Sequence, residues 1–154
     1  MRDLSLHILD LAQNSVRANA ALVEIMVSVD ESRLITITIR DDGSGMSDEL
    51  KERVTSPFAT TRTTRKVGLG IPLMMQNARL AGGDVRIDST LGQGTTLTAT
   101  LHGDSIDCLP LGDLAGTVVS LVSANPERPD FRLSCSSPKG SMDFDTREMR
   151  QALG

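Results

Sequence analysis

Two consecutive segments with strictly alternating apolar residues constrain the fold of this chain more than any other feature. Residues 22–29 and 34–40 place valine or isoleucine at every second position, and the residues between them are polar except Met26. A period of two puts all the apolar side chains on one face of a strand. Residues 30–33, which separate the segments, are polar and long enough for a hairpin turn. The pattern therefore predicts an antiparallel pair of strands with one buried face.

Similar patterns in the surrounding sequence predict two layers. Periodicity predicts helices at 4–20, 47–54 and 71–81 and further strands around 85–87 and 97–101. Asp3 or Ser5 is suited to cap the first helix and Ser47 the second, while Gly82 follows the third. Helices on one face of a mostly antiparallel sheet are the economical packing for these elements. We therefore predict an α+β two-layer sandwich for residues 1–102.

Residues 103–154 form a second segment. They contain an apolar stretch at 114–122 that predicts a buried helix, a candidate hairpin at 131–144 and the start of a last helix at 145. So short a segment cannot build a strong core of its own. We expect a small C-terminal extension that packs on the first domain, on its own hairpin or on a second copy of the chain, which would make a homodimer.

Charge and composition exclude several classes of function. The net charge of −4 argues against non-specific nucleic-acid binding, and the absence of Trp and Tyr removes most base-stacking platforms. No apolar run approaches the ~20 residues of a membrane-spanning helix, and the first residues do not resemble a signal peptide. Cys108 and Cys135 lie far apart without metal-ligand spacing. We expect a cytoplasmic protein with no nucleic-acid or membrane partner.

Four local signals follow one another along the chain, and each has a plain structural interpretation. Asp10 and Asn14 lie one helical turn apart, where an amide oxygen can ligate Mg²⁺ and a carboxylate can activate water; the alternative is an ordinary polar face. Asp41, Gly43 and Gly45 follow a strand, where a carboxylate can accept from an exocyclic amine and glycines admit a flat ring; the alternative is a plain turn. Gly94-Thr95 alone predicts only a hairpin turn.

The third signal is a threonine- and cation-rich segment that leads into a helix. Hydroxyls, cations and the backbone N–H groups of a helix start can together hold phosphates. The pattern matches neither a Walker A loop nor a dinucleotide-binding fingerprint. A solvated loop is the alternative. The phosphate-binding candidates are Thr60, Thr61, Arg62, Arg65, Lys66, Gly68, Leu69 and Gly70.

The order of these signals resembles the GHKL superfamily, which includes DNA gyrase, the heat-shock chaperone, histidine kinases and mismatch-repair ATPases. Residues 10–20 resemble its N box, 41–46 its G1 box, 56–61 the F box of kinase lids, 68–71 its G2 box and 94–95 its last box. The resemblance covers about residues 4–102 and implies the Bergerat fold with a split site for ATP and Mg²⁺.

The resemblance also implies roles for single residues. Asn14 ligates Mg²⁺, Asp41 accepts from the adenine amine, Gly43 and Gly45 make room for the base, and Thr95 supports the Asp41 contact through water. Met46 completes the G1 box. Gly68 and Gly70 hinge a lid over the nucleotide, from which Arg62, Arg65 or Lys66 reaches the phosphates. We expect residues 55–67 to be mobile without nucleotide and to order when it binds.

Two departures from the family pattern bear on activity. Hydrolytic members carry Glu where this chain has Asp10, the candidate catalytic base, and Asp is one methylene shorter. Sensor kinases place a phosphoacceptor histidine on a helix before the N box, whereas His7 lies within the first helix and His102 at a strand end. We expect His7 to be packed or half-exposed rather than phosphorylated, and any kinase activity to act on another protein.

The resemblance implies a bacterial ATP-binding regulatory domain. It would transfer phosphate to a regulatory partner protein, in the manner of a histidine kinase, or hydrolyse ATP slowly. The alternative is a non-catalytic, nucleotide-sensing module that binds a protein, as an anti-sigma factor does. A mismatch-repair-like ATPase fits the residues after Asn14 but not the short, acidic chain.

Overall fold

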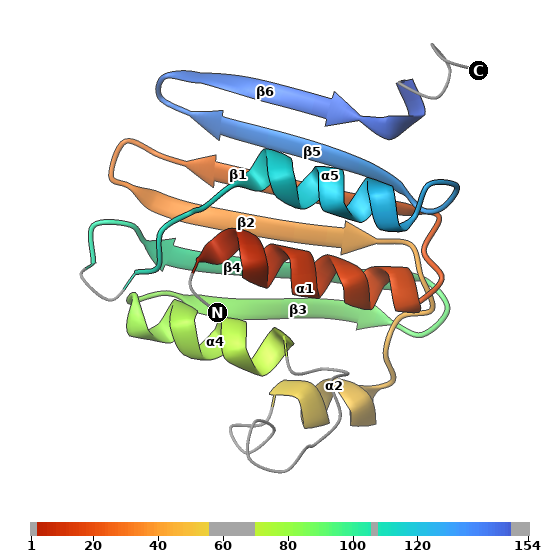
Figure 1. Ribbon diagram of the computed structural model, residues 1–154. Coiled ribbons are helices and arrows are strands. Elements are labelled where there is room, and N and C mark those ends of the chain that lie inside the picture. The colour runs from red at the N-terminus through yellow and green to blue at the C-terminus, as the bar shows by residue number, and fades with distance from the viewer. Residues whose placement is uncertain (1–2, 56–69, 106–107, 149–154) are drawn as a thin grey trace.

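The molecule consists of a six-stranded sheet with helices on one face (Figure 1). The computed structural model describes residues 3–55, 70–105 and 108–148. The strand order across the sheet is β3-β4-β2-β1-β5-β6. In chain order the elements are α1 (Leu4–Arg17), β1 (Leu22–Val29), β2 (Leu34–Asp41), α2 (Asp48–Thr55), α4 (Gly70–Leu80), β3 (Asp84–Thr90), β4 (Gly94–His102), α5 (Leu114–Ala124), β5 (Asp130–Ser137) and β6 (Gly140–Asp145).

The predicted hairpin forms the centre of the sheet. β1 and β2 pair antiparallel, with Ile25 opposite Ile39 and Val27 opposite Ile37. All four side chains are buried. The opposite face is polar and carries cross-strand threonine pairs from β2 and β4, such as Thr38 with Thr98. The predicted α+β sandwich, mostly antiparallel with helices on one face, is confirmed.

Helices α1, α4 and α5 cover the apolar face of the sheet (Figure 1). They bury aliphatic side chains against it, and Phe131 is the one aromatic residue among the described core. Asp3 is the N-cap of α1 because its carboxylate accepts from the backbone N–H of Leu6. The other candidate, Ser5, donates its hydroxyl to Asp3 instead. Ser47 caps α2 as predicted, accepting from the N–H of Leu50 at 3.2 Å.

Residues 108–148 contribute to both layers. β5 pairs in parallel with β1, placing Leu133 beside Ile25, and β6 completes the predicted hairpin. Helix α5 covers this half of the sheet and contacts α1 (Figure 1). The last predicted helix begins at residues 146–148, and its remainder lies outside the described residues. The division of the chain at His102 into a domain and an extension stays a prediction.

None of the helices found in residues 3–55, 70–105 and 108–148 combines the length and the apolar character needed to cross a bilayer. The predicted loop at 55–67 falls outside the described residues, apart from Thr55 at the end of α2.

Candidate functional site

Polar side chains meet at one end of the sheet, on the face that the helices cover. Asp41, the last residue of β2, lies opposite Thr95 at the start of β4, and Thr95 lies opposite Ser89 of β3. The second half of α1 runs toward this end of the sheet (Figure 1), and α4 begins beside Asp10 in the middle of α1. The fold therefore brings together the segments that resemble the N box, the G1 box and the last box, which lie at residues 10–20, 41–46 and 94–95 of the chain.

The Asp41 carboxylate is held from two sides. Ser15 of α1 donates its hydroxyl to Oδ2 at 2.5 Å, and the backbone N–H of Gly43 donates to Oδ1 at 2.9 Å. Ser15 is 4% exposed. A carboxylate oxygen has room for more than one donor, so both oxygens keep capacity for a ligand. Asp41 is therefore a pre-oriented acceptor at the edge of the helix–sheet interface.

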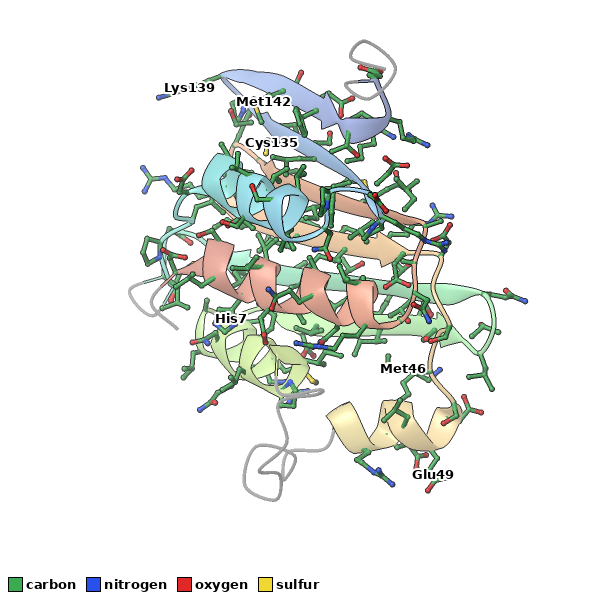
Figure 2. The ribbon with its side chains drawn as sticks, turned by 45° about the vertical axis from the view of Figure 1, so that its right-hand side comes forward. His7, Met46, Glu49, Cys135, Lys139 and Met142 are labelled. Carbon is green, nitrogen blue, oxygen red and sulfur yellow. The ribbon has the colours of Figure 1, made fainter. Side chains whose placement is uncertain are left out.

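A second group of hydrogen bonds lies beside Asp41, toward the edge of the sheet. The hydroxyls of Thr95 and Ser89 are 2.8 Å apart, and Ser89 Oγ also accepts from the backbone N–H of Met46 at 2.8 Å. Figure 2 shows Met46 on the segment between β2 and α2. These bonds connect the turn after β2 to the β3–β4 hairpin, so Thr95 and Met46 share Ser89 as a hydrogen-bond partner.

The glycines of the turn have packing reasons within the chain itself. A Cβ atom on Gly43 would lie 2.6 Å from the carbonyl oxygen of Ala18. Gly45 has a φ of +69° and its Cα faces the Thr90 carbonyl, where a side chain would clash. Close contact with α1 and β3 thus requires both glycines, and their role beside a base stays a prediction.

Asp42 anchors the same turn to the start of β1. Its Oδ1 accepts from the backbone N–H groups of Leu22 and Ala21, at 3.0 and 2.7 Å. These bonds stabilise the carboxylate form and lower the pKa of Asp42. The turn that carries Asp41 is therefore fixed at its neighbouring residue as well.

Asp10 and Asn14 lie one turn apart on α1, and Asp10 faces the start of α4. Gly70, the first residue of α4, packs so closely on Asp10 that a methyl group there would overlap the carboxylate oxygen Oδ2. Asn14 Oδ1 accepts from Arg17 Nη1 at 2.7 Å. A candidate water-activating carboxylate, a candidate magnesium ligand and a cation therefore follow one another along α1.

Sequence reasoning missed three residues of this arrangement. Ser15 carried a usable signal, because it is a polar residue on the apolar stripe of α1. Ser89 carried a similar one, since it continues the inward-facing series of Val85 and Ile87. Arg17 lies three positions after Asn14, where side chains of a helix meet.

The remaining candidates cannot be placed. Thr60, Thr61, Arg62, Arg65, Lys66, Gly68 and Leu69 lie outside the described residues. The predicted phosphate cradle is therefore represented here by Gly70 alone.

Comparisons with known proteins show the family to which this chain belongs. A family model described as histidine kinase-, DNA gyrase B- and HSP90-like ATPase matches residues 2–105. An uncharacterized sensor-like histidine kinase of Rhizobium meliloti (strain 1021) is 33% identical over 88 residues, which cover 52% of this chain and 17% of that protein. Sensor histidine kinase WalK of Bacillus subtilis (strain 168) is 30% identical over 100 residues, covering 60% of this chain and 16% of WalK.

A likeness in structure extends further along the chain. The crystal structure of the N-terminal domain of a DNA repair protein covers 94% of this chain and 52% of its own, with a TM-score of 0.52 and 15% identity. At that identity it shows the fold alone. The chain spans less than a fifth of the length of the two kinases above. On the family match and the shared architecture, this chain belongs to the family of histidine kinase-, DNA gyrase B- and HSP90-like ATPases.

Proposed function

We propose that this chain is an ATP-binding regulatory domain that holds Mg·ATP between α1, α4 and the ends of β2 and β4. The observation that carries the proposal is the Asp41 carboxylate, fixed by Ser15 and Gly43 and aligned with Thr95. A fixed acceptor of this kind suits the exocyclic amine of adenine, which donates hydrogen bonds. Guanine would present its O6 acceptor to the same carboxylate, so we expect GTP to bind more weakly.

The donor set fits a magnesium ion held mainly by phosphates. The described part of the chain contains no group of three or more His, Cys, Asp or Glu side chains that could hold a metal by themselves. Magnesium commonly takes one or two protein oxygens together with substrate phosphates. Asn14 Oδ1 would be the protein ligand here, after releasing Arg17. When bound, the ion would neutralise charge on the phosphate oxygens.

Two uses of the bound nucleotide are open to this site. Asp10 lies against Gly70 and is the candidate base for phosphate transfer to a regulatory partner protein or for slow hydrolysis. Its side chain is shorter than the Glu of hydrolytic relatives. This favours, as the second candidate, a module that senses nucleotide and binds a protein without turnover. Transfer of label from γ-labelled ATP to a co-purified protein separates the two.

Isothermal titration calorimetry with ATP and Mg²⁺ tests the binding proposal. Asp41→Asn would present an amide donor to the adenine amine, and an unmatched polar pair costs roughly 1–3 kcal/mol. We expect an affinity loss of about 5- to 150-fold. Asp88→Asn is the matched control, because Asp88 is exposed on β3 and undergoes the same change of charge. Equal ATP affinity in wild type and Asp41→Asn would contradict the assignment.

A further inference from the structure

A polar contact between α1 and α4, away from Asp41, involves His7. This residue of α1 is 1% exposed, and its Nε2 lies 3.0 Å from Nδ2 of Asn77 in α4. Figure 2 places His7 where α1 faces α4. Asn77 Nδ2 also donates to the carbonyl oxygen of Leu73 at 3.1 Å. Because Nδ2 is a donor only, Nε2 must act as the acceptor, which makes His7 neutral with its proton on Nδ1.

Protonation of His7 is incompatible with this arrangement. In the imidazolium form both ring nitrogens are donors, so Nε2–H would face the Asn77 amino group. Among the described residues Nδ1 has no hydrogen-bond partner, so the new charge would have no partner on that side either. Asn77 would have to rotate its amide and give up the Leu73 bond, or α4 would have to move.

In the part of the chain that the structure describes, few charges surround His7. Burial is the main cause that lowers its pKa, and the positive charge at the amino terminus adds to it. Asp10 and Asp3 on the same side of the molecule act in the opposite direction. On α4 the charged residue is Arg79, which pairs with Asp84 at 3.0 Å, and α5 contains no ionisable side chain. Of the strands beneath α1, β2 ends at Asp41, which is bonded to Ser15, and Glu24 of β1 pairs with Arg132.

The contact is linked to the candidate site through both helices. Asn77 belongs to the helix whose first residue, Gly70, packs on Asp10. His7 belongs to the helix that carries Asp10, Asn14 and Ser15. A shift of α4 against α1 therefore changes the surroundings of Asp10 and of Gly70 together.

We propose that His7 and Asn77 form a proton-sensitive latch, in which protonation of His7 loosens α4 from α1 and weakens nucleotide binding at the site between them. The inference rests on the proposed function for its effect on ATP. The loosening of α4 itself does not depend on any ligand.

Calorimetry with ATP and excess Mg²⁺ at about pH 8 and at a pH below the midpoint of the His7 NMR titration tests the latch, because burial lowers the pKa of His7 below the ordinary histidine value. We expect the wild-type affinity to fall by about three- to tenfold at the lower pH, since one linked proton changes affinity by up to tenfold per pH unit. His7→Gln keeps an acceptor but does not titrate, so its affinity should change much less. His102→Gln, which removes the exposed histidine at the end of β4, should retain the wild-type response.

A second variant and a second readout keep the test independent of folding and of ATP. Asn77→Asp places a carboxylate beside His7 and should raise the midpoint of the His7 NMR titration by about one unit or more. Hydrogen exchange in residues 70–80, corrected for intrinsic rates and measured without ATP, should increase below that midpoint. Wild type that binds no ATP at about pH 8 would contradict the proposed function alone. An unchanged exchange rate across the His7 titration, or a full pH response in His7→Gln, would overturn the latch.

Discussion

Phe131 and Asp41 are the two cross-strand neighbours of Val23 and so lie in one row across the sheet, but their surroundings differ. Phe131 in β5 is fully buried, whereas Asp41 in β2 is partly exposed and bonded to Ser15. The row continues from Asp41 through Thr95 to Ser89, all polar. The half of the row formed by Asp41, Thr95 and Ser89 thus has polar side chains, which we propose bind the ligand, in place of buried apolar ones. The other half, formed by β1, β5 and α5, contains buried apolar side chains that stabilise the fold.

The largest expected effect comes from removing the apolar half. Truncation after His102 would expose β1 and α1 where Phe131, Leu133, Val118 and Leu121 now cover them. Each such side chain contributes roughly 1.5–3 kcal/mol when buried, and a whole domain is stable by only about 5–15 kcal/mol. We expect a large fall in melting temperature or outright insolubility, measured by calorimetry and gel filtration.

A single substitution sharpens the same contrast. Phe131→Ala should lower the free energy of unfolding by about 3–5 kcal/mol, while the folded fraction still binds ATP with near wild-type affinity. Met142→Ala, at a residue that is 49% exposed, is the control. For the truncation after His102 described above, a protein with the melting temperature and elution volume of the full chain would show that the two halves are independent.

Asp10 tests the polar half for chemistry rather than binding. If Asp10 is the base, Asp10→Asn should lower any ATP turnover by about 10²- to 10⁴-fold and leave ATP affinity nearly unchanged. Steady-state phosphate release and calorimetry on the same preparation measure the two quantities. An unaltered turnover rate in the variant would place the base elsewhere.

The smallest expected effect is the pH dependence of the free energy of unfolding, and it comes from His7 at the contact between α1 and α4. Burial lowers the pKa of His7 in the folded protein, so the unfolded chain takes up a proton at higher pH. The contribution of neutral His7 to the free energy of unfolding is therefore fully present above about pH 6.5. It is lost as the pH falls toward the folded-state pKa, by at most about 1.4 kcal/mol per pH unit. Asp42, whose pKa is also lowered, loses its contribution only below about pH 4. Urea unfolding of wild type and His7→Gln between about pH 4 and pH 6.5 measures how the free energy of unfolding of each protein depends on pH. The same pH dependence in both proteins would contradict the prediction.

Periodicity in the sequence was sufficient for most of the fold. The alternation in β1 and β2 fixed which residues face the helices, because a period of two leaves one arrangement with a buried face. The parallel partnership of β1 with β5 was not predictable in the same way. The alternation of β5 shows which face is apolar but carries no information about which strand, a hundred residues away, lies beside it.

The candidate site divides along similar lines. Asp41 stands out locally, since an acidic residue and two glycines follow a strand. Ser15 and Ser89 gain their meaning from partners distant in sequence, although each interrupts an apolar series and could have been singled out on that ground. The cation-rich segment before Gly70 has no such periodicity, and its residues stay predictions.

The parallel pairing of β1 with β5 has a consequence for how the chain acquires its structure. β1 is an early strand, but one of its two neighbours comes from residues 130–137, and the N–H of Leu4 bonds to the carbonyl of Pro110. Contacts between such distant residues slow folding, because the intervening loop must close first. During synthesis on the ribosome, β1 therefore remains an open strand edge until more than a hundred further residues have been added, and open edges invite pairing with other chains. β1 lies at the centre of the finished sheet, and during synthesis its unpaired edge is exposed to pairing with other chains.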